Sequence, residues 1–252
     1  MRKTIILNML AACLQLKIDL CNRSDNIRRA LGLAEQALNK GAHILVFPEL
    51  FLTGFCYQST AWSSPPFPAL DTFRNISQEY ECVIIGSLMS NRMNLGFCLD
   101  SESIEFQPKI HPFDQEKEYF CGGDFITPID TKYGKIGLQI CYDLRFPEVA
   151  RSLALKGADF LVTIAQFPSQ RLFHWRTLCI ARAIENQIPH IACNWANAGD
   201  SIIIDAWGEV LAEAGYNETL IVGQVDYAGR NGFRKMIPCF ADRRPEIYER
   251  NS

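Results

Sequence analysis

One of the ten cysteines in this 252-residue chain stands where a nucleophile would be expected. Cys141 ends the apolar part of GLQICYDLRFPE, and the segment that follows predicts a helix. A turn between a strand and a helix presents backbone N–H groups to a developing oxyanion, and a helix N-terminus favours a thiolate. The alternative interpretation is a core cysteine at a strand end, because cysteine is often fully buried.

Histidine is the usual activating base for a cysteine, but the four histidines of this chain are poorly placed for that role. His43 and His190 each open a predicted strand, and His174 lies in a predicted helix beside a tryptophan. His111 follows a lysine in the segment PKIHPFD. We interpret all four as structural.

A carboxylate base with a lysine is the other way to activate a thiol. Glu49 follows the apolar run ILVFP, and burial of a carboxyl group makes it a better proton acceptor near neutral pH. Lys109 lies between Pro108 and Ile110, and an ammonium near Cys141 would stabilise both a thiolate and an oxyanion. A buried ion pair or two surface charges are the alternative interpretations of Glu49 and Lys109.

Helices and strands that alternate along the chain must position these residues. Apolar residues at helical spacing predict helices at 22–40, 69–80, 146–156 and 172–186. Ser24 or Asp25 can cap the first helix, and Gly41 suits its end. Short apolar runs predict strands at 43–49, 82–88, 94–104, 135–141, 159–165 and 190–193. The tail, 201–225, predicts two or three antiparallel strands, with Trp207 and Gly208 in the turn of the first hairpin.

Two stretches repeat each other, KGAHILVFPE from Lys40 and KGADFLVTIA from Lys156. Each follows a predicted helix and forms a predicted strand, which indicates two similar halves, each a sheet with helices on one side. Packing the two sheets face to face predicts an α/β fold, a four-layer αββα sandwich. We expect one domain over residues 1–252.

Charge and hydropathy exclude two classes of binding partner. The net charge is −3 and the pI about 5.9, so we expect no nucleic-acid partner. No segment approaches the roughly 20 apolar residues of a membrane span, so we expect no membrane partner either. Arg2 and Lys3 precede TIILNMLAAC, which resembles a signal peptide ending at Cys13, but Asn8 interrupts its short apolar run. A first buried strand that runs on to Leu16 is the favoured interpretation.

The cysteines lie in apolar segments, and no two form a Cys-x-x-Cys pair, which argues against a zinc site or a thioredoxin-like motif. Free, buried cysteines in a reducing compartment are the better interpretation, and we expect a cytoplasmic protein. We expect no metal.

Three ordered blocks resemble the signature of the nitrilase, or carbon–nitrogen hydrolase, superfamily: FPELFLTGF, KIHPFDQEKEYFCGGD and CYDLRFPEVAR. The resemblance continues through HWRTLCIARAIENQ, SIIIDAWGEVLAE and FADRRPEIY, and it therefore covers almost the whole chain. It implies the αββα fold, a homodimer or larger homo-oligomer, and no cofactor. It also favours a core strand over a signal peptide at the N-terminus.

The resemblance implies roles for the matched positions. A Glu-Lys-Cys triad of general base, oxyanion-stabilising lysine and nucleophile matches Glu49, Lys109 and Cys141. The second glutamate of the family matches Glu116, with Glu118 as the alternative.

The substrate side of the site is implied in the same way. The backbone N–H of Tyr142 would complete the oxyanion hole. CYDLRFPE with Arg145 resembles the ω-amidase and deaminated-glutathione-amidase branches, in which the matching arginine is associated with a substrate carboxylate. A helix cap or an inter-subunit salt bridge is the alternative for Arg145. In FPSQRLFHW, Phe167 and Trp175 would line or support the pocket.

The implied activity is hydrolysis of the C–N bond of a small, carboxylate-bearing amide by water, with release of ammonia through a Cys141 thioester. The alternatives are an N-carbamoyl amidohydrolase, a deaminated-glutathione amidase, a nitrile hydrolase, and a non-catalytic binding protein on the same scaffold. The loop in NWANAGDSIIID, around Asn194–Ser201, is shorter than is usual in the family, which bears on substrate size.

Overall fold

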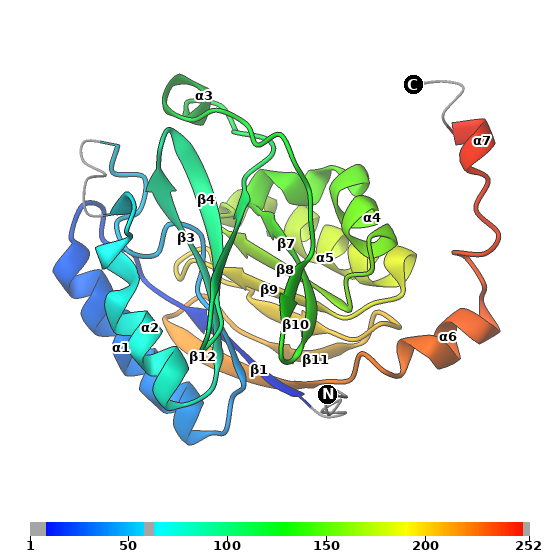
Figure 1. Ribbon diagram of the computed structural model, residues 1–252, viewed down its shortest axis with the longest axis horizontal. Helices are drawn as coiled ribbons and strands as arrows, with labels where there is room; N and C mark the ends of the chain where they lie inside the picture. The colour runs from blue at the N-terminus through cyan, green and yellow to red at the C-terminus, as the bar shows by residue number, and fades with distance from the viewer. Residues whose placement is uncertain (1–8, 58–62, 249–252) are drawn as a thin grey trace.

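The computed structural model describes residues 9–57 and 63–248, which form two packed sheets with helices on their outer faces (Figure 1). One sheet, here sheet A, has the strand order β12 (Thr219–Val225), β1 (Met9–Gln15), β2 (Ile44–Val46), β3 (Val83–Ser90), β4 (Met93–Leu99) and β5 (Ile104–Pro108). The other, sheet B, has the order β11 (Val210–Glu213), β10 (Ile202–Ile204), β9 (His190–Asn194), β8 (Phe160–Ala165), β7 (Gly134–Ile140) and β6 (Ile129–Thr131).

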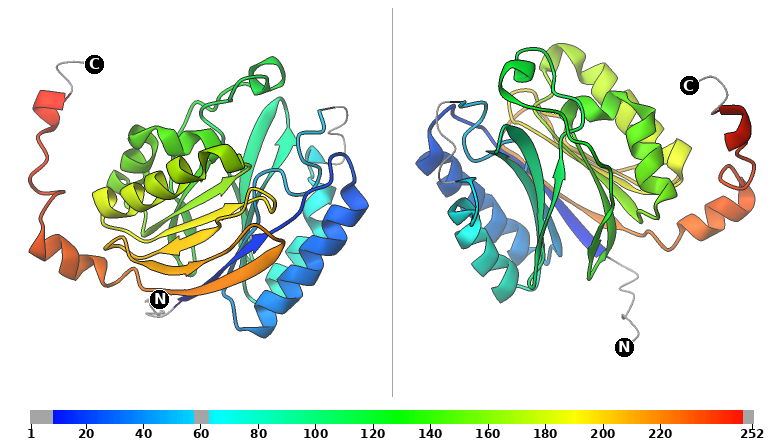
Figure 2. Two further views of the ribbon diagram at one scale, coloured as in Figure 1. Left: turned by 180° about the vertical axis from the view of Figure 1, so that it is seen from behind. Right: turned by 45° about the horizontal axis from the view of Figure 1, so that its top comes forward.

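The helices lie outside the sheets (Figures 1 and 2). Helices α1 (Arg23–Asn39) and α2 (Asp71–Glu79) cover sheet A, whereas α4 (Pro147–Leu155) and α5 (Leu172–Asn186) cover sheet B. Shorter helices are α3 (Glu116–Tyr119), α6 (Arg230–Met236) and α7 (Pro245–Tyr248), and 3₁₀ turns are η2 (Pro68–Leu70), η3 (Cys141–Arg145) and η4 (Ser169–Arg171). The predicted αββα sandwich is confirmed.

The two sheets repeat one pattern of strand pairing, as the sequence repeat predicts. Three parallel strands form the centre of each sheet, β1-β2-β3 in one and β7-β8-β9 in the other. An antiparallel strand flanks one side of this centre, and an antiparallel pair flanks the other. The repeated stretches form β2 and β8, which hold the same central place in the two sheets.

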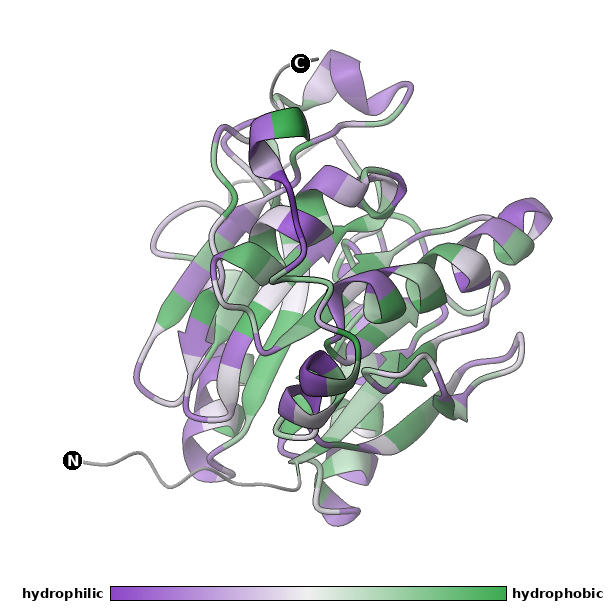
Figure 3. Ribbon diagram, turned by 90° about the vertical axis from the view of Figure 1, so that its right-hand side faces the viewer, coloured by the Kyte–Doolittle hydropathy of each residue, from purple (hydrophilic) through white to green (hydrophobic). Residues whose placement is uncertain are grey.

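The apolar runs are continuous because the central strands are covered on both faces. Residues such as Val46, Ile85, Leu138 and Val162 fill the core between the sheets. Alternate residues of sheet A, such as Leu45, pack instead against the apolar stripe of α1. Figure 3 shows the outer helices with both polar and apolar residues, as expected for helices that bury one face.

Several predicted boundaries need correction. Asn22, rather than Ser24 or Asp25, caps α1, and its side chain accepts the N–H of Asp25. The segment 94–104 is not one strand. It contains most of β4, a turn at Asp100–Ser103 and the first residue of β5, and the two strands pair as a hairpin.

The tail does form three strands, and Gly208 turns the first hairpin with a φ of 96°. The third of them, β12, leaves that sheet and pairs with β1 of sheet A instead. The N-terminal strand predicted up to Leu16 is present as β1, while residues 1–8 of that prediction lie outside the described part of the chain.

After β12, the chain continues to α6 and α7, which lie beyond α4 and α5 (Figure 2). Arg234 and Gln187 connect this segment to the end of α5 through hydrogen bonds to Asn186 and Ile237. Within the described residues, no helix combines the length and the apolar character that a membrane crossing requires.

Candidate active site

The ends of three strands, β2, β5 and β7, converge at one edge of the sandwich. Glu49 follows β2, Lys109 follows β5 and Cys141 follows β7, while Glu116 opens α3. The Nζ atom of Lys109 lies 2.8 Å from Glu49 Oε1 and 2.8 Å from Glu116 Oε2. The structure therefore brings four residues together, although the first and the last of them, Glu49 and Cys141, are 92 positions apart in the sequence. Lys109 is only 1% exposed and Glu49 is fully buried.

Both oxygens of the Glu49 carboxylate have fixed donors. Oε1 accepts a hydrogen bond from Asn94 Nδ2 at 2.7 Å as well as from Lys109. Oε2 accepts the backbone N–H of Gln166 at 2.9 Å. The indole of Trp195 also donates to the backbone carbonyl of Glu49, at 2.6 Å. Glu49 is thus held by a side chain in β4 and by the residues that directly follow β8 and β9, so both sheets set its orientation.

The charges shift the proton affinities of the cluster. Burial raises the pKa of Glu116 above its usual value, and the negative charge of Glu49 adds to that effect. Burial by itself would lower the pKa of Lys109, but the negative charges of Glu49, of Cys141 when it is ionised, and of Glu116 outweigh burial and raise that pKa. Lys109 therefore stays a cation between two carboxyl groups. Glu118, the alternative second glutamate, is exposed and lies two residues after Glu116 in α3.

Cys141 is half-buried beside this cluster, in a strained backbone conformation. Its φ of 49° lies in the left-handed region, which a non-glycine residue adopts at a cost of roughly 1–3 kcal/mol. Burial raises the pKa of its thiol well above the usual value, and the charge of Glu49 raises it further, while Lys109 lowers it. The resting side chain is accordingly a thiol, and a base must remove its proton before it can attack.

Comparison with known proteins identifies the family of this chain. The sequence model of the family described as carbon–nitrogen hydrolase matches residues 10–235. The chain belongs to the carbon–nitrogen hydrolase family. Its relatives include the 2-oxoglutaramate amidase of Bacillus subtilis (strain 168), which is 33% identical over 94% of this chain and 98% of that protein. The ω-amidase NIT2 of Bos taurus is 30% identical over 90% of this chain and 92% of that protein.

A solved structure shares the fold over nearly the full length of both chains. The carbon–nitrogen hydrolase from Helicobacter pylori G27 superposes with a TM-score of 0.86 at 28% identity, covering 96% of this chain and 97% of that one. The nitrilase-superfamily resemblance and the hydrolase class predicted from the sequence are both confirmed. The protein is a hydrolase of carbon–nitrogen bonds other than peptide bonds.

The residues predicted for the substrate side of this hydrolase lie around the turn after Cys141. The ring of Tyr142 contacts Phe113 and Phe146, with centroids 4.7 and 5.1 Å away. The guanidinium of Arg145 lies 5.0 Å over the ring of Phe167. In the part of the chain that the structure describes, no carboxylate pairs with Arg145, so an intrachain salt bridge does not account for it.

Phe167 and Trp175 form the layer behind Arg145. Phe167 is 3% exposed and Trp175 is fully buried, with ring centroids 5.3 Å apart. The indole N–H of Trp175 donates to the carbonyl of Asp200, in the shortened loop, at 2.7 Å. Trp175 is therefore a buried residue that packs behind Phe167 and holds the loop at Asp200.

The histidines of the hydrolase have partners that suit structural roles. The fully buried His190 contacts Thr163 and the carbonyl of Cys179, and burial lowers its pKa to about 4. The Nδ1 atom of His43 accepts the N–H of Leu10. His174 lies 3.5 Å from a guanidinium nitrogen of Arg145.

Only five of the ten cysteines are both free and buried, and half-buried Cys141 is free. The expectation of free, buried cysteines is wrong for the other four. Cys21 and Cys56 form a disulfide, and Cys121 and Cys239 are exposed. The disulfide ties the loop before α1 to the segment that follows Glu49, where the N–H of Cys21 also donates to the carbonyl of Thr53. Cysteine spacing could not reveal this pair, because the two residues meet only after β1 and β2 have paired.

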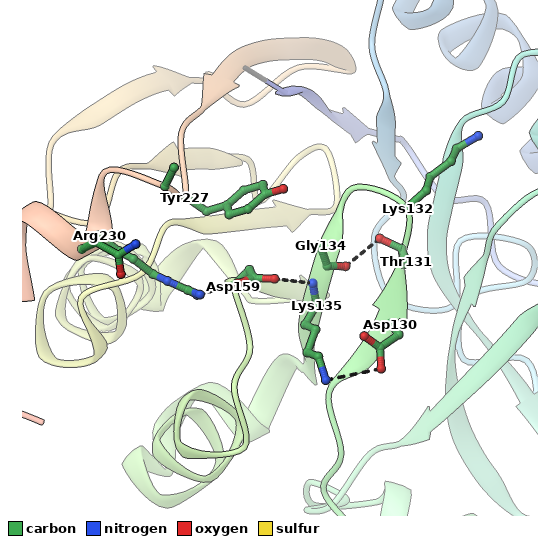
Figure 4. A pocket seen from close by; sticks show the side chains of 10 residues that line it. Asp130, Thr131, Lys132, Gly134, Lys135, Asp159, Tyr227 and Arg230 are labelled. Atoms are coloured by element: carbon green, nitrogen blue, oxygen red, sulfur yellow. Dashed lines mark hydrogen bonds and ion pairs between the residues drawn. The ribbon is translucent and has the colours of Figure 1, made fainter. Parts of the chain in front are cut away.

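A cavity of about 320 Å³ lies away from Glu49, Lys109 and Cys141 (Figure 4). Its lining includes Lys135 and Asp159, at the starts of β7 and β8, whereas Cys141 follows the end of β7. It contains none of the predicted site residues. Across residues 9–57 and 63–248, no group of three His, Cys, Asp or Glu side chains is arranged to hold a metal ion.

Sequence reasoning missed two side chains that contact the cluster. Asn94 donates to Glu49, and the signal that could have revealed it is a polar amide within the otherwise apolar strand MNLGFCL. The carboxylate of Asp143 binds backbone groups next to Lys109 and Cys141. Its signal was weaker, since Asp is common in the first turn after a strand.

Proposed function

We propose that this hydrolase is an ω-amidase-like amidohydrolase in which Cys141 is the nucleophile and Glu49 the general base. The observation that carries the proposal is the contact of buried Glu49 and Lys109 beside a thiol whose pKa is raised. Burying such charges is costly, and replacing them by apolar residues often stabilises a protein. A non-catalytic binding protein would have no use for this cluster, which favours the enzyme.

The reaction begins with proton transfer. Glu49 takes the proton from Cys141 Sγ, and the thiolate attacks the amide carbon to form a carbon–sulfur bond. The resulting oxyanion is stabilised by the ammonium of Lys109 and the backbone N–H of Tyr142. Protonated Glu49 then gives its proton to the leaving nitrogen, the carbon–nitrogen bond breaks, and ammonia departs from a Cys141 thioester.

Water completes the cycle. Glu49 removes a proton from water, which attacks the thioester carbon, and the carbon–sulfur bond breaks to give the carboxylic acid product. The proton on Glu49 returns to the thiolate of Cys141. Glu116 keeps Lys109 in place throughout, through the 2.9 Å contact of its Oε1 with Nζ. No step needs a metal or a cofactor.

We propose that the substrate is a small amide bearing a carboxylate that binds Arg145. The guanidinium has no carboxylate partner among the described residues and lies in the turn that starts at Cys141. A planar guanidinium suits bidentate carboxylate binding. The names of the relatives, 2-oxoglutaramate amidase and ω-amidase, support a substrate of this class.

Ammonia release from a panel of ω-amides, N-carbamoyl compounds and nitriles tests the activity. We expect ω-amides with a free carboxylate to be hydrolysed fastest, and Cys141→Ala to abolish release. Cys239→Ala, which changes an exposed free cysteine elsewhere, is the matched control and should retain activity. Equal ammonia release by wild type and Cys141→Ala would disprove the assigned nucleophile.

A variant of Arg145 tests the substrate class separately. Hydrogen bonds to charged groups contribute about 1.5–3 kcal/mol, so Arg145→Ala should raise KM for carboxylate-bearing amides by roughly 10- to 100-fold. Uncharged amides of similar size should be affected less than about threefold, because they lose no charge-assisted bond. The same KM increase for both substrates would refute the carboxylate contact.

We further propose that the protein forms a homodimer or a larger homo-oligomer. Large apolar side chains are exposed at the end of α5, on the β10–β11 turn and at the end of α6: Ile184, Trp207, Met236 and Ile237. Exposed apolar residues that cluster in this way are typical of interfaces. Sedimentation should therefore give a mass above that of one chain, and Ile184→Asp should lower it, whereas the distant Leu20→Asp should not.

A cytoplasmic location is likewise a proposal. It is supported by the eight cysteines that remain free, including exposed Cys121 and Cys239. The Cys21–Cys56 disulfide argues against a cytoplasmic location, because disulfides persist in oxidising compartments. Thiol counting on protein extracted with an alkylating agent present tests the proposal, which requires Cys21 and Cys56 to be labelled.

A further inference from the structure

Asp143 takes no part in the proposed reaction, yet its buried carboxylate accepts several hydrogen bonds. It lies two residues after Cys141 in η3, and its side chain is only 1% exposed. A buried carboxylate is costly unless its oxygens accept hydrogen bonds. The identity of its donors therefore indicates what this carboxylate does.

The donors come from the two chain segments that carry Lys109 and Cys141. Asp143 Oδ2 accepts the N–H of Ile140, the residue before Cys141, at 3.2 Å. The same oxygen accepts the N–H of Ile110, the residue after Lys109, at 3.3 Å. One carboxylate oxygen thus connects the end of β7 in sheet B to the end of β5 in sheet A.

His111 completes the arrangement around the other oxygen. Asp143 Oδ1 accepts the backbone N–H of His111 at 2.9 Å and lies 2.9 Å from its Nδ1 atom. A carboxylate can only accept, so Nδ1 carries the hydrogen and donates it. The imidazole ring also stacks on Phe146, with ring centroids 3.7 Å apart. The ring is thereby held between η3 and the segment after Lys109.

This connection matters because catalysis depends on distances between groups from different sheets. The oxyanion that forms at Cys141 must lie within roughly 3 Å of its donors, and a misplacement of about 1 Å can lower the rate by roughly 100-fold. Cys141 also has a strained φ of 49°, which the surrounding structure must maintain. Asp143 contacts the backbone on the N-terminal side of that strained residue.

We propose that Asp143 is a positioning residue that holds the Lys109 ammonium and the Cys141 thiol at their catalytic separation, with His111 as its side-chain donor. The proposal rests on the function proposed above, because it takes Lys109 and Cys141 as the reacting groups. Asp143 touches neither substrate nor the reacting atoms. It acts through the backbone of its neighbours.

Asp143→Asn is the direct test, because it keeps the shape and replaces one acceptor oxygen by an amide nitrogen that faces N–H donors. We expect kcat to fall by about 100-fold while KM changes less than about threefold. Alkylation of Cys141 by iodoacetamide, followed by mass spectrometry of its peptide, should slow by at least about tenfold, because the thiolate loses the well-placed ammonium. Exposed Cys239 in the same sample is the reference for reagent activity.

Asp100→Asn is the matched control. Asp100 also joins the two sheets, since its Oδ2 accepts the N–H of Lys132 at 3.1 Å and its Oδ1 that of Ser101 at 2.7 Å. It does so in the turns at the opposite ends of β4 and β7, away from Cys141. Its replacement should lower the unfolding midpoint as much as Asp143→Asn does, and leave kcat and Cys141 alkylation unchanged.

His111 provides a second pair of variants, which decide the question if Asp143→Asn fails to fold. His111→Asn places an amide N–H where Nδ1–H was and should keep kcat within about twofold of wild type. His111→Phe keeps the stacking on Phe146 but removes the donor, and it should lower kcat by about tenfold.

The proposal is overturned if Asp143→Asn and His111→Phe lower the unfolding midpoint but leave kcat and Cys141 alkylation at wild-type values. It is also overturned if His111→Asn is as impaired as His111→Phe, because the Nδ1 hydrogen bond would then not matter. Failure of the proposed function has a different signature, namely no amide hydrolysis by the wild type. The alkylation rates need no substrate and would still decide the role of Asp143.

Discussion

Replacing Lys109 by methionine would remove the cation that separates two buried carboxyl groups. Glu49 is fully buried and Glu116 is 6% exposed, and both contact the Lys109 ammonium within 2.9 Å. Methionine keeps the length and the approximate volume of the side chain but carries no charge. The variant therefore tests how strongly the cluster depends on charge rather than on packing.

The expected loss of stability is large. Breaking a buried ion pair by removing one partner costs about 3–5 kcal/mol, because it leaves an uncompensated buried charge. The loss is limited when a carboxyl group takes up a proton. Glu116 is the group expected to do so, since burial and Glu49 already raise its pKa and Lys109 opposes that rise.

The pH dependence has a definite sign. A carboxyl group whose pKa is raised in the folded state holds a proton there at pH values where the unfolded chain has lost it. Stability contributed by that group is present below its ordinary pKa of about 4.3 and is lost as pH rises through the folded value. The destabilisation of Lys109→Met should therefore be smaller at pH 5 than at pH 8, where it should reach about 3–5 kcal/mol.

Urea unfolding of wild type and Lys109→Met at both pH values measures this difference. Adding Glu116→Gln to Lys109→Met should recover at least half of the loss at pH 8, because one unpaired carboxylate is removed. Lys135→Met is the matched control, since its contact with Asp130 is exposed and should contribute at most about 1 kcal/mol. A loss below about 1 kcal/mol for Lys109→Met, or one independent of pH, would refute the buried charge cluster.

Three further changes have expected outcomes. Cys21→Ser opens the disulfide that closes a loop of 35 residues, and chain-entropy arguments give a loss of about 4 kcal/mol, measurable by urea unfolding without reductant. Asn94→Leu removes a hydrogen bond from the Glu49 carboxylate and should lower kcat by about tenfold, whereas an unchanged kcat would show that this bond is dispensable. Gly199→Ala would place a Cβ 2.6 Å from the carbonyl oxygen of Gly215, at a φ of 79°. The variant should therefore lose about 2 kcal/mol in its free energy of unfolding, which a lower melting temperature would reveal.

Local patterns were sufficient to predict most of the elements. The apolar runs and the helical stripes predicted β2, β8 and α5 within a few residues, because burial on one face or two leaves a period in the sequence. The repeated KGA stretches predicted two equivalent halves, and the two sheets confirm it. These features depend on residues close together in the chain.

Pairing over long distances was not predictable in the same way. The strand β12 pairs with β1 at the other end of the chain, although its neighbour β11 belongs to sheet B. Nothing in the pattern of TLIVGQV distinguishes the two sheets, since both offer an apolar edge. The choice is made by packing of the whole sandwich.

The residues of the candidate site could be predicted from the sequence, but their contacts could not. Glu49, Lys109 and Cys141 could be selected from the sequence because each places a reactive or charged group at the end of an apolar run. Only the structure revealed their contact, the hydrogen bond that Asn94 donates to Glu49, and the backbone hydrogen bonds that Asp143 accepts beside Lys109 and Cys141.

The sequence by itself determined the kind of fold and the types of residue available for chemistry, because periodicity, charge and motif order are local properties of the chain. Only the tertiary structure decided which carboxylate contacts Lys109, which cysteines are joined, and which side chain connects Lys109 to Cys141. The physical reason is that distance and burial set the strength of an ionic or hydrogen-bonding contact, and both arise only when the two sheets pack together.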